Sequence, residues 1–417
     1  MPNQTSRPIS LLPGRWGTLI LGVIVVATVL GASPPASAAV TGRASYSITT
    51  DTSHLTLDQR QHLAAHRVKY HHAPPARVAQ IPPDDDLRTA CAAHPSQAAT
   101  PPLGWLRDRY QQCFSKRLDF IAINDGTGAP AGEITFQLWL LGWANNGARQ
   151  VDYLLSVEDI TVSTIPGNVI NWPGQNIAIG LRGCTSSATI TCASGVRKTV
   201  DGWFQVPSQG MTYSSPPGTG VGDDKIVRTG VVLDVTVGTP PIRPGTQFDV
   251  VQTNMRFDSG RGIGRANGSV FPDFTPVYAL SLSDPAVTQS ARHIFDAQNH
   301  PERTFPSWPG KTVPGKTEPL HRLFDNALQA ANNTAAVAVC TDVWGDYSGT
   351  GQQCDEYPFA TTREGAYTGT VANGGLQRFS ARLINGSDNG TAGSRLGATY
   401  SDQRVLPDDA FLVRVDP

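Results

Sequence analysis

The chain has no excess of positive charge. Its 417 residues include 33 Lys or Arg and 34 Asp or Glu, which gives a formal net charge of −1. This balance argues against a globally basic protein that binds nucleic acid through its overall charge. Acidic residues outnumber basic ones at the C-terminal end, where residues 318–417 contain seven arginines, no lysine and twelve acidic residues. A polyanion could bind there only through a local group of arginines.

Long hydrophobic runs are also missing, except near the N-terminus. Residues 19–30 form an apolar run that follows Arg7 and Arg15, but glycine and proline interrupt and end it short of a comfortable membrane span. The small residues Ala36-Ser37-Ala38 come next, in the pattern of a signal-peptide cleavage site. We expect a signal peptide over 1–38, and a secreted, extracellular protein without membrane contact after cleavage. The alternative interpretation is an uncleaved membrane anchor.

The six cysteines include no Cys-x-x-Cys pair. In an exported chain this favours disulfides over a zinc site, because the compartment is oxidising. Six cysteines allow fifteen pairings, and proximity in the sequence favours three of them. These are Cys91 with Cys113, Cys184 with Cys192, and Cys340 with Cys354. The last pair would tether the residues that follow Cys354 to the preceding segment.

The length predicts two or three domains, and the patterning predicts an α+β multidomain protein. An all-β, sandwich-like domain with flanking helices comes first and a small mixed domain comes last. The expected segments are a signal peptide over 1–38, a helical N-terminal segment and linker over 39–118, a β-sandwich-like domain over 119–290, a Pro-rich linker over 291–318, and a C-terminal domain over 319–417.

Period-two alternation supports the all-β domain. Ile134, Phe136 and Leu138 alternate with polar residues, and 231–237 repeats the pattern, as half-buried antiparallel strands do. Gly, Pro and Asn turns separate such runs, which is typical of a sandwich or barrel. The polar loops of this region present no catalytic set, so the domain is expected to bind, space or shield.

Helical patterns flank this region. Thr56-Leu57-Asp58-Gln59 fits a capping box that opens a helix through about Tyr70. Apolar residues at helical spacing predict a second helix over 103–117. In the C-terminal domain the patterns predict, in order, a helix at 320–331, a strand at 335–339, an acidic loop, a strand at 376–383, a helix at 391–400 and a strand at 411–415.

Candidate chemistry gathers in two stretches of the C-terminal domain. Asp355 and Glu356 stand between Cys354 and Pro358, and a proline stiffens the backbone beside them. The run Ser387-Asp388-Asn389 reads as a helix start made of capping residues. By themselves the two acids are more often an exposed turn, and the second run is more often only a cap. Together they offer a base and an oxygen-ligand pair.

These stretches resemble the secreted NucA/NucB family of non-specific deoxyribonucleases. The resemblance is carried by Cys-Asp-Glu-Tyr-Pro-Phe-Ala from Cys354, by Arg363-Glu364-Gly365, and by Ser-Asp-Asn followed by Ala-Gly-Ser from Ser387. Actinobacterial members also carry the Pro-Leu-His-Arg-Leu run found at 319–323. The resemblance covers about the last hundred residues and implies a small ββα-metal-type nuclease domain that cuts DNA through backbone contacts.

The resemblance implies a role for each residue. Asp355 is expected to activate a water, with Glu356 as a second catalytic carboxylate, while Asn389 and Asp388 hold one Mg²⁺ or Mn²⁺. The base is histidine in most ββα-metal enzymes, but no histidine follows His321, so the base is expected to be a carboxylate. His321 is expected to pack or hydrogen-bond, and Glu364 to orient its loop.

Four arginines are expected to bind substrate phosphate: Arg378, Arg382, Arg395 and Arg404. Arg395 stands where other members have an aromatic residue, so the site could also differ in rate or be inactive. Two alternatives to a DNase therefore stay open. One is a non-catalytic, secreted β-rich binding or surface protein with a degenerate nuclease-like domain. The other is a metal-dependent phosphodiesterase for a small or teichoic-type substrate.

Overall fold

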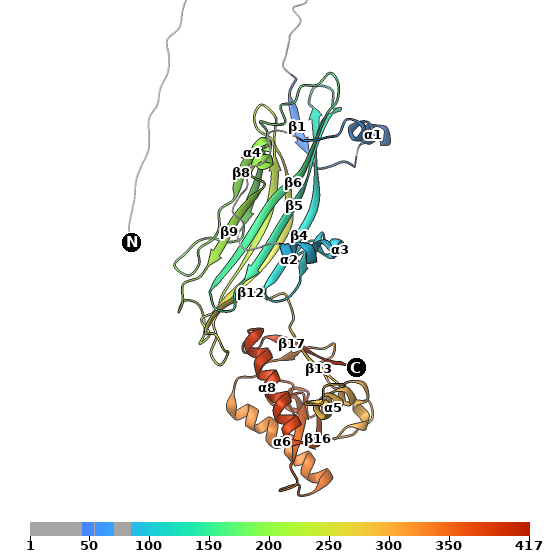
Figure 1. Cartoon of the computed structure of the whole chain (residues 1–417), viewed down its shortest axis with the longest axis vertical. Coiled ribbons are helices and arrows are strands. Elements are labelled where there is room, and N and C mark those ends of the chain that lie inside the picture. Colours follow the sequence, from blue (N-terminus) through green and yellow to red (C-terminus); the bar gives the residue numbers. More distant parts are fainter. Residues whose placement is uncertain (1–43, 54, 71–84) are drawn as a thin grey trace, which may run out of the picture. The chain divides into compact units, whose positions relative to one another are not determined.

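The structure is a computed structural model that describes residues 44–53, 55–70 and 85–417 (Figure 1). The expected signal peptide lies outside the described residues. The described part combines many strands with several helices, so the α+β prediction is confirmed. Within it, no helix has the length and apolar character needed to cross a membrane.

Two antiparallel sheets occupy residues 46–270. The first contains β1 (Tyr46–Thr49), β2 (Val68–Lys69), β3 (Trp105–Leu106), β4 (Gln111–Asn124), β5 (Pro130–Ala144), β6 (Gln150–Thr164) and β9 (Ser208–Ser214). The second contains β7 (Asn176–Arg182), β8 (Val196–Thr199), β10 (Val227–Val237), β11 (Gly245–Ser259) and β12 (Asn267–Val270). Buried side chains of both sheets, such as Phe136 and Val235, belong to one hydrophobic cluster, as their period-two alternation requires.

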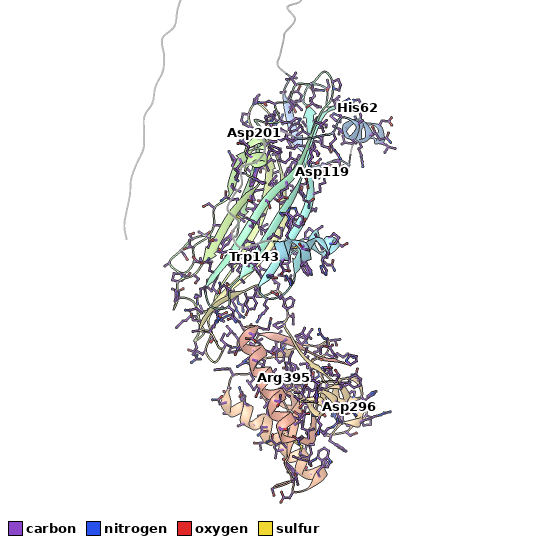
Figure 2. All side chains as sticks on the ribbon, viewed as in Figure 1. His62, Asp119, Trp143, Asp201, Asp296 and Arg395 are labelled. Carbon is purple, nitrogen blue, oxygen red and sulfur yellow. A yellow bond between two sulfur atoms is a disulfide. The ribbon has the colours of Figure 1, made fainter. Side chains whose placement is uncertain are left out.

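Short helices accompany these sheets: α1 (Leu57–Ala65), α2 (Asp85–Ala92), α3 (Pro95–Ala98) and α4 (Val200–Gln205). The capping box at Thr56 and Gln59 is confirmed, because each side chain accepts a hydrogen bond from the other residue's backbone N–H. The helix ends at Ala65 and not near Tyr70, since Val68 and Lys69 pair with β6 as strand β2. Figure 2 shows all described side chains on this ribbon.

The predicted helix over 103–117 is wrong. Trp105 and Leu106 form β3, and residues from Gln111 onward form β4, which pairs with β5 over thirteen positions. The long ladder satisfies the backbone hydrogen bonds of this segment, so its tertiary partner overrides a local helical spacing. Cys113 of β4 is joined to Cys91 of α2, which confirms that disulfide.

The C-terminal domain starts earlier than the sequence suggested. Its strands are β13 (Val277–Ser281), β14 (Leu320–His321), β15 (Gln352–Tyr357), β16 (Ser380–Asn385) and β17 (Ala410–Asp416). Its helices are α5 (Thr288–Asn299), the 3₁₀ helix η1 (Pro301–Arg303), α6 (Asn326–Trp344), α7 (Thr368–Ala372) and α8 (Gly386–Asp402). Strand β13 runs parallel to β17, β14 pairs with the other edge of β17, and β15 pairs antiparallel with β16.

The expected linker over 291–318 is wrong in its first third, because it contains most of α5. Ala291, Ile294 and Ala297 of this helix are buried in one cluster with Leu320 and Phe411. Their spacing of three residues puts them on one face of the helix. The prolines that suggested a linker all follow α5, at 301–319.

The predicted strand over 335–339 is also wrong, because these residues lie inside α6. Asn332, Ala336 and Cys340 form its buried face at intervals of four. The alanine-rich sequence favours a helix, and a short apolar run cannot distinguish a strand from a helix by periodicity alone.

A buried network of charges joins β11 to the segment between α8 and β17. Arg404 is fully buried and bonds Asp258 through Nε (3.1 Å) and Nη2. It also donates to the backbone carbonyls of Arg265, Ala266 and Asn267. A side chain at Gly268 would lie 2.3 Å from the Arg404 guanidinium carbon, so glycine leaves the room it needs. This placement contradicts the prediction that Arg404 contacts substrate phosphate.

Lys311 is a buried amine with no bonded carboxylate among the described residues. Its Nζ donates to the carbonyl oxygens of Thr304 (3.1 Å) and Pro306 (2.7 Å) and to Thr304 Oγ1 (3.0 Å). Burial lowers the pKa of Lys311 to about 7. A lysine of the unfolded chain has a pKa of about 10.4. Between these two values the unfolded chain binds one more proton than the folded chain, so this group makes stability rise with pH.

We therefore expect Lys311→Met to change how stability depends on pH. In the wild type, Lys311 should add a slope of at most about 1.4 kcal/mol per pH unit to the free energy of unfolding above pH 7. Lys311→Met should lack this slope, and Lys316→Met, at an exposed position, should keep it. Urea unfolding at pH 7, 8 and 9 measures the three slopes. Parallel slopes for wild type and Lys311→Met would contradict the assignment.

Candidate active site

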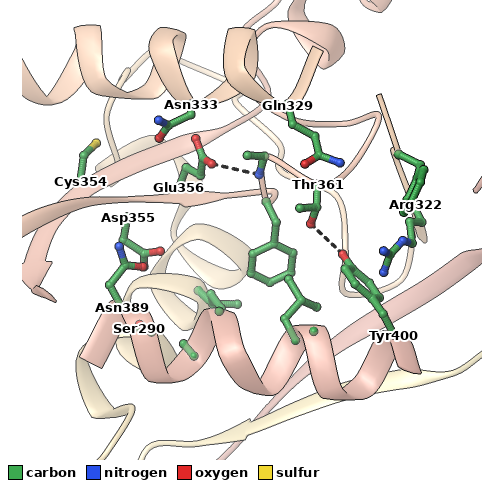
Figure 3. A pocket seen from close by; sticks show the side chains of 18 of the residues that line it. Ser290, Arg322, Gln329, Asn333, Cys354, Asp355, Glu356, Thr361, Asn389 and Tyr400 are labelled. Carbon is green, nitrogen blue, oxygen red and sulfur yellow. Dashed lines mark hydrogen bonds between the residues drawn. The ribbon is translucent and has the colours of Figure 1, made fainter. Parts of the chain in front are cut away.

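A pocket of about 430 Å³ opens between β15, α6 and α8 of the C-terminal domain (Figure 3). Asp355 and Glu356 of β15 line it together with Asn389 of α8. The pocket thus brings together three of the four residues that the sequence predicted for catalysis and metal binding. Strand β16 is followed directly by α8, and β16 pairs with β15, so this strand pair and the helix after it bring the three side chains to one place.

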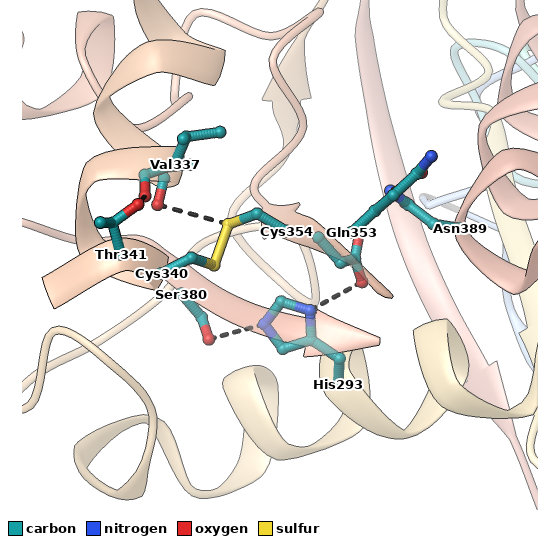
Figure 4. The surroundings of a disulfide bond; sticks show 10 residues. His293, Val337, Cys340, Thr341, Gln353, Cys354, Ser380 and Asn389 are labelled. Carbon is teal, nitrogen blue, oxygen red and sulfur yellow. Dashed lines mark hydrogen bonds and ion pairs between the residues drawn. A yellow bond between two sulfur atoms is a disulfide. The ribbon is translucent and has the colours of Figure 1, made fainter. Parts of the chain in front are cut away.

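Asp355 is held by a histidine that the sequence analysis did not consider. His293 of α5 is completely buried, and its Nδ1 lies 2.7 Å from Asp355 Oδ2. Its Nε2 lies 2.7 Å from Ser380 Oγ, and Figure 4 marks this contact with a dashed line. A carboxylate only accepts hydrogen bonds, so Nδ1 donates to Oδ2, while Nε2 and the Ser380 hydroxyl share the second hydrogen bond. Both ends of the imidazole are fixed, and with them the direction of the Asp355 side chain.

His293 itself does not line the pocket, whereas Asp355 does. The Oδ1 atom of Asp355 has no hydrogen-bond partner among the described residues. Of this pair, Asp355 is therefore the group that can accept a proton from a molecule in the pocket. The sequence placed His293 in a linker, although the helical spacing of Ala291, Ile294 and Ala297 marks a helix there.

The disulfide between Cys340 of α6 and Cys354 of β15 lies directly before Asp355 (Figure 4). Cys184 and Cys192 also pair, so the three predicted disulfides are confirmed. Closing a loop with a sequence separation of 14 residues contributes about 3 kcal/mol in the chain-entropy model. The bond ties β15 to α6 next to the pocket.

Glu356 presents an unsatisfied acceptor. Its Oε1 accepts from the Ala360 N–H (3.0 Å), but its Oε2 is buried and has no hydrogen-bond partner in the described part of the chain. Burial, and then the neighbouring Asp355, raise the pKa of Glu356 to about 8, against the opposing effect of the Ala360 N–H. A buried carboxyl oxygen without a donor is costly, and such atoms are concentrated at functional sites.

Asp388 does not lie where a metal ligand is needed. Its Oδ2 accepts from the Gln289 N–H (2.8 Å), and its Oδ1 accepts from the N–H and the hydroxyl of Ser290 (2.9 and 2.7 Å). Helix α5 has no side-chain cap of its own at Val287, so Asp388 caps it from α8. The predicted metal-binding role of Asp388 conflicts with this geometry, because both of its oxygens already accept backbone or hydroxyl hydrogens.

Asn389 lies beside Asp355 in the pocket (Figure 3). Its Nδ2 donates to Gln353 Oε1 (3.2 Å), while its Oδ1 has no hydrogen-bond partner among the described residues. The cap of α8 is Asn385, which accepts from the N–H groups of Ser387 and Asp388. Asn389 therefore has no capping role and offers its amide oxygen to the pocket.

Two oxygens of these pocket residues that lack a hydrogen-bond partner among the described residues are of the chemical kind that binds a hard, hydrated cation. Glu356 Oε2 and Asn389 Oδ1 are oxygen ligands of the kind that Mg²⁺ and Mn²⁺ prefer, and Mg²⁺ usually keeps several waters. Among the described residues, no group of three or more His, Cys, Asp or Glu residues is arranged to hold a metal. Any cation bound here would have few protein ligands.

The four arginines predicted to bind phosphate do not line the pocket. Each arginine is paired with a carboxylate from another segment. Two of these carboxylates lie in the expected linker. The pairs are Arg378 with Glu318, Arg382 with Asp296, Arg395 with Asp284, and Arg404 with Asp258. Arg395 and Asp296 are labelled in Figure 2. The four arginines therefore do not gather beside the pocket, contrary to the expected cluster.

Glu364 and His321 also lie outside the pocket lining. Glu364 accepts from the His321 N–H (2.9 Å), and its other oxygen lies 2.8 Å from His321 Nδ1. The pair ties the loop after β15 to β14. This agrees with the expected roles, an orienting one for Glu364 and a hydrogen-bonding one for His321.

Comparison with curated proteins and with solved structures finds no match. A family model does match one part of the chain, and this part contains Asp355, Glu356, Asn389 and Arg322 but not His293. Residues 322–414, in the C-terminal domain, match the deoxyribonuclease NucA/NucB family.

Proposed function

We propose that the C-terminal domain is a secreted, metal-dependent endodeoxyribonuclease that hydrolyses DNA without sequence specificity. The observation that carries the proposal is the Asp355 carboxylate, which His293 holds at 2.7 Å with its other oxygen facing a pocket that also contains Glu356 and Asn389. The pocket lies largely within the segment that matches a deoxyribonuclease family.

Asp355 acts as the general base. A water in the pocket attacks phosphorus as its proton passes to Asp355 Oδ1, the new P–O bond forms, and the bond to the 3′ oxygen breaks. The leaving oxygen takes a proton from solvent, which leaves a 5′-phosphate and a 3′-hydroxyl. The His293 N–H on Oδ2 keeps Oδ1 directed at the pocket throughout. Such proton transfer contributes about 10²-fold to 10⁴-fold in rate.

Glu356 and Asn389 are the residues that would hold Mg²⁺ or Mn²⁺. When bound, a divalent cation supplies positive charge against the phosphate oxygens and the leaving oxygen. Because burial raises the pKa of Glu356 to about 8, this carboxyl must lose its proton before it can act as a ligand.

Nicking of supercoiled plasmid tests the proposal. The chain without residues 1–38 should convert supercoiled DNA to open circles and then to fragments with unrelated end sequences. Mg²⁺ or Mn²⁺ should be required, and EDTA should stop the reaction. A protein that leaves plasmid intact with both metals would refute the proposal and favour a non-catalytic binding protein. Cleavage of a small phosphodiester with intact plasmid would favour the small-substrate phosphodiesterase.

His293→Phe should lower kcat for DNA about 10-fold to 100-fold, because a base displaced by about 1 Å costs on this scale. The KM for DNA should not change, since His293 does not line the pocket. His293→Asn, whose amide can donate near the position of Nδ1, should recover part of the rate. Steady-state cleavage of a fluorescent duplex measures both constants. A folded His293→Phe protein with wild-type kcat would show that the histidine does not position Asp355.

A further inference from the structure

Arg322 is the one arginine of residues 318–417 that bonds no carboxylate, and this whole range is described. The other six each have a partner: the four pairs given above, Arg363 with Asp408, and Arg414 with Asp416. Arg322 lines the same pocket as Asp355. It belongs to the Pro-Leu-His-Arg-Leu run at 319–323, in which only His321 had an expected role.

The backbone fixes where the Arg322 side chain enters the pocket. Its N–H donates to the Asp409 carbonyl oxygen (3.1 Å), and its own carbonyl oxygen accepts from the Asp408 N–H (2.9 Å). Its guanidinium carbon lies 3.9 Å from the centre of the Tyr400 ring and 5.6 Å from that of Phe324. The Tyr400 hydroxyl is bonded to Thr361 Oγ1 at 2.9 Å, so the ring itself is held in place.

The guanidinium is desolvated but not neutralised. The residue is only 9% exposed, and its Nε and Nη1 are buried with no hydrogen-bond partner in the described part of the chain. Burial lowers the pKa of Arg322, and Tyr400, Asp224 and Asp409 oppose this only through space. Aromatic faces attract a cation but accept none of its N–H hydrogen bonds well. A buried charged group whose N–H donors have no hydrogen-bond acceptor is rare, unless a ligand supplies the acceptors.

Figure 3 shows Arg322 and Tyr400 at the opposite end of the pocket from Asp355 and Asn389, with Glu356 and Thr361 between them. We infer that Arg322 binds a phosphate of the substrate strand next to the phosphate that is attacked at Asp355. The inference rests on the proposed nuclease function. The planar guanidinium offers parallel donors that match two phosphate oxygens. Such a contact fixes the strand's register and reads no base, as a non-specific enzyme requires.

The test compares Arg322→Met with Arg378→Met, whose arginine is paired with Glu318 away from the pocket. DNA affinity is measured by fluorescence anisotropy in an Asp355→Asn background, over a series of salt concentrations. Arg322→Met should weaken binding about 10-fold to 100-fold, as loss of a charged hydrogen bond predicts. It should also reduce the salt dependence by about one phosphate contact. Arg378→Met should leave both unchanged.

A second substrate locates the phosphate. Bis(p-nitrophenyl) phosphate has a single phosphodiester and no neighbour, so Arg322→Met in the otherwise wild-type protein should raise the KM for DNA by a larger factor than the KM for this ester. Equal losses on both substrates would overturn the assignment, because Arg322 would then act on the attacked phosphate. Binding and salt dependence equal to those of Arg378→Met would also overturn it.

Arg322→Lys is a control for misfolding. It keeps the positive charge at this buried position but lacks the parallel N–H donors of the guanidinium. It should bind DNA with an affinity between those of wild type and Arg322→Met. If both variants bind as wild type does, the inference fails. The anisotropy measurement needs no cleavage, so an inactive wild type would refute the proposed function and leave this inference to be decided by binding.

Discussion

Asp355→Asn should lower kcat for DNA cleavage about 10²-fold to 10⁴-fold, the range in which a general base contributes. Asparagine has nearly the same shape as aspartate, and its amide oxygen can still accept the His293 N–H that bonds Oδ2 at 2.7 Å in the wild type. The substitution thus removes basicity while it preserves the position of the side chain. The fold should be intact, because no other side chain in the described part bonds Asp355.

The matched control is Asp342→Asn, at an exposed position near the end of α6. It removes the same charge from the same domain without changing the pocket lining. Single-turnover cleavage of an end-labelled duplex in Mg²⁺ compares the two variants with wild type. A rate for Asp355→Asn within a few-fold of that of Asp342→Asn would mean that Asp355 does not take the proton.

Arg404→Met should lower the free energy of unfolding by about 3–5 kcal/mol, the typical cost of breaking a buried ion pair. The substitution removes the cation that bonds three backbone carbonyls and the Asp258 carboxylate, which is completely buried. Arg256 still bonds Asp258, so one carboxylate oxygen keeps its partner. The other oxygen of this buried carboxylate loses its partner, which is the larger part of the cost.

Arg414→Met is the control, because Arg414 forms an exposed pair with Asp416 and such pairs contribute about 0–1 kcal/mol. Urea unfolding followed by tryptophan fluorescence measures both variants. Equal midpoints for the two would contradict a structural role for Arg404. Arg404→Met should also keep its affinity for DNA under conditions in which it is folded, in contrast to the phosphate contact that the sequence suggested.

Patterns that depend on neighbours in the sequence were predictable. The strands that contain residues 134–138 and 231–237 follow from period-two alternation, the start of α1 from its capping box, and the three disulfides from cysteine spacing, whereas the strand expected at 203–206 is wrong because Val200–Gln205 form α4. In the pocket, Asp355, Glu356 and Asn389 were found because their motif resembles that of a known family, and the structure brings them together.

Features set by tertiary partners were not predictable. The pairing of four arginines with carboxylates depends on the folded arrangement, and so does the capping of α5 by Asp388. His293 was missed because the prolines after α5 suggested a linker, although a histidine on a helix with a buried face was visible in the sequence. The high proline content of residues 301–319 correctly indicated an irregular segment, but this segment begins only after α5 has ended.

Binding and cleavage measured on one labelled duplex test the central claim most directly. With Mg²⁺ present, the Asp355→Asn protein should bind the duplex as tightly as wild type does and leave it uncut over a period in which wild type degrades it completely. Cleavage by the variant at the wild-type rate would contradict the claim that this pocket hydrolyses DNA with Asp355 as its base.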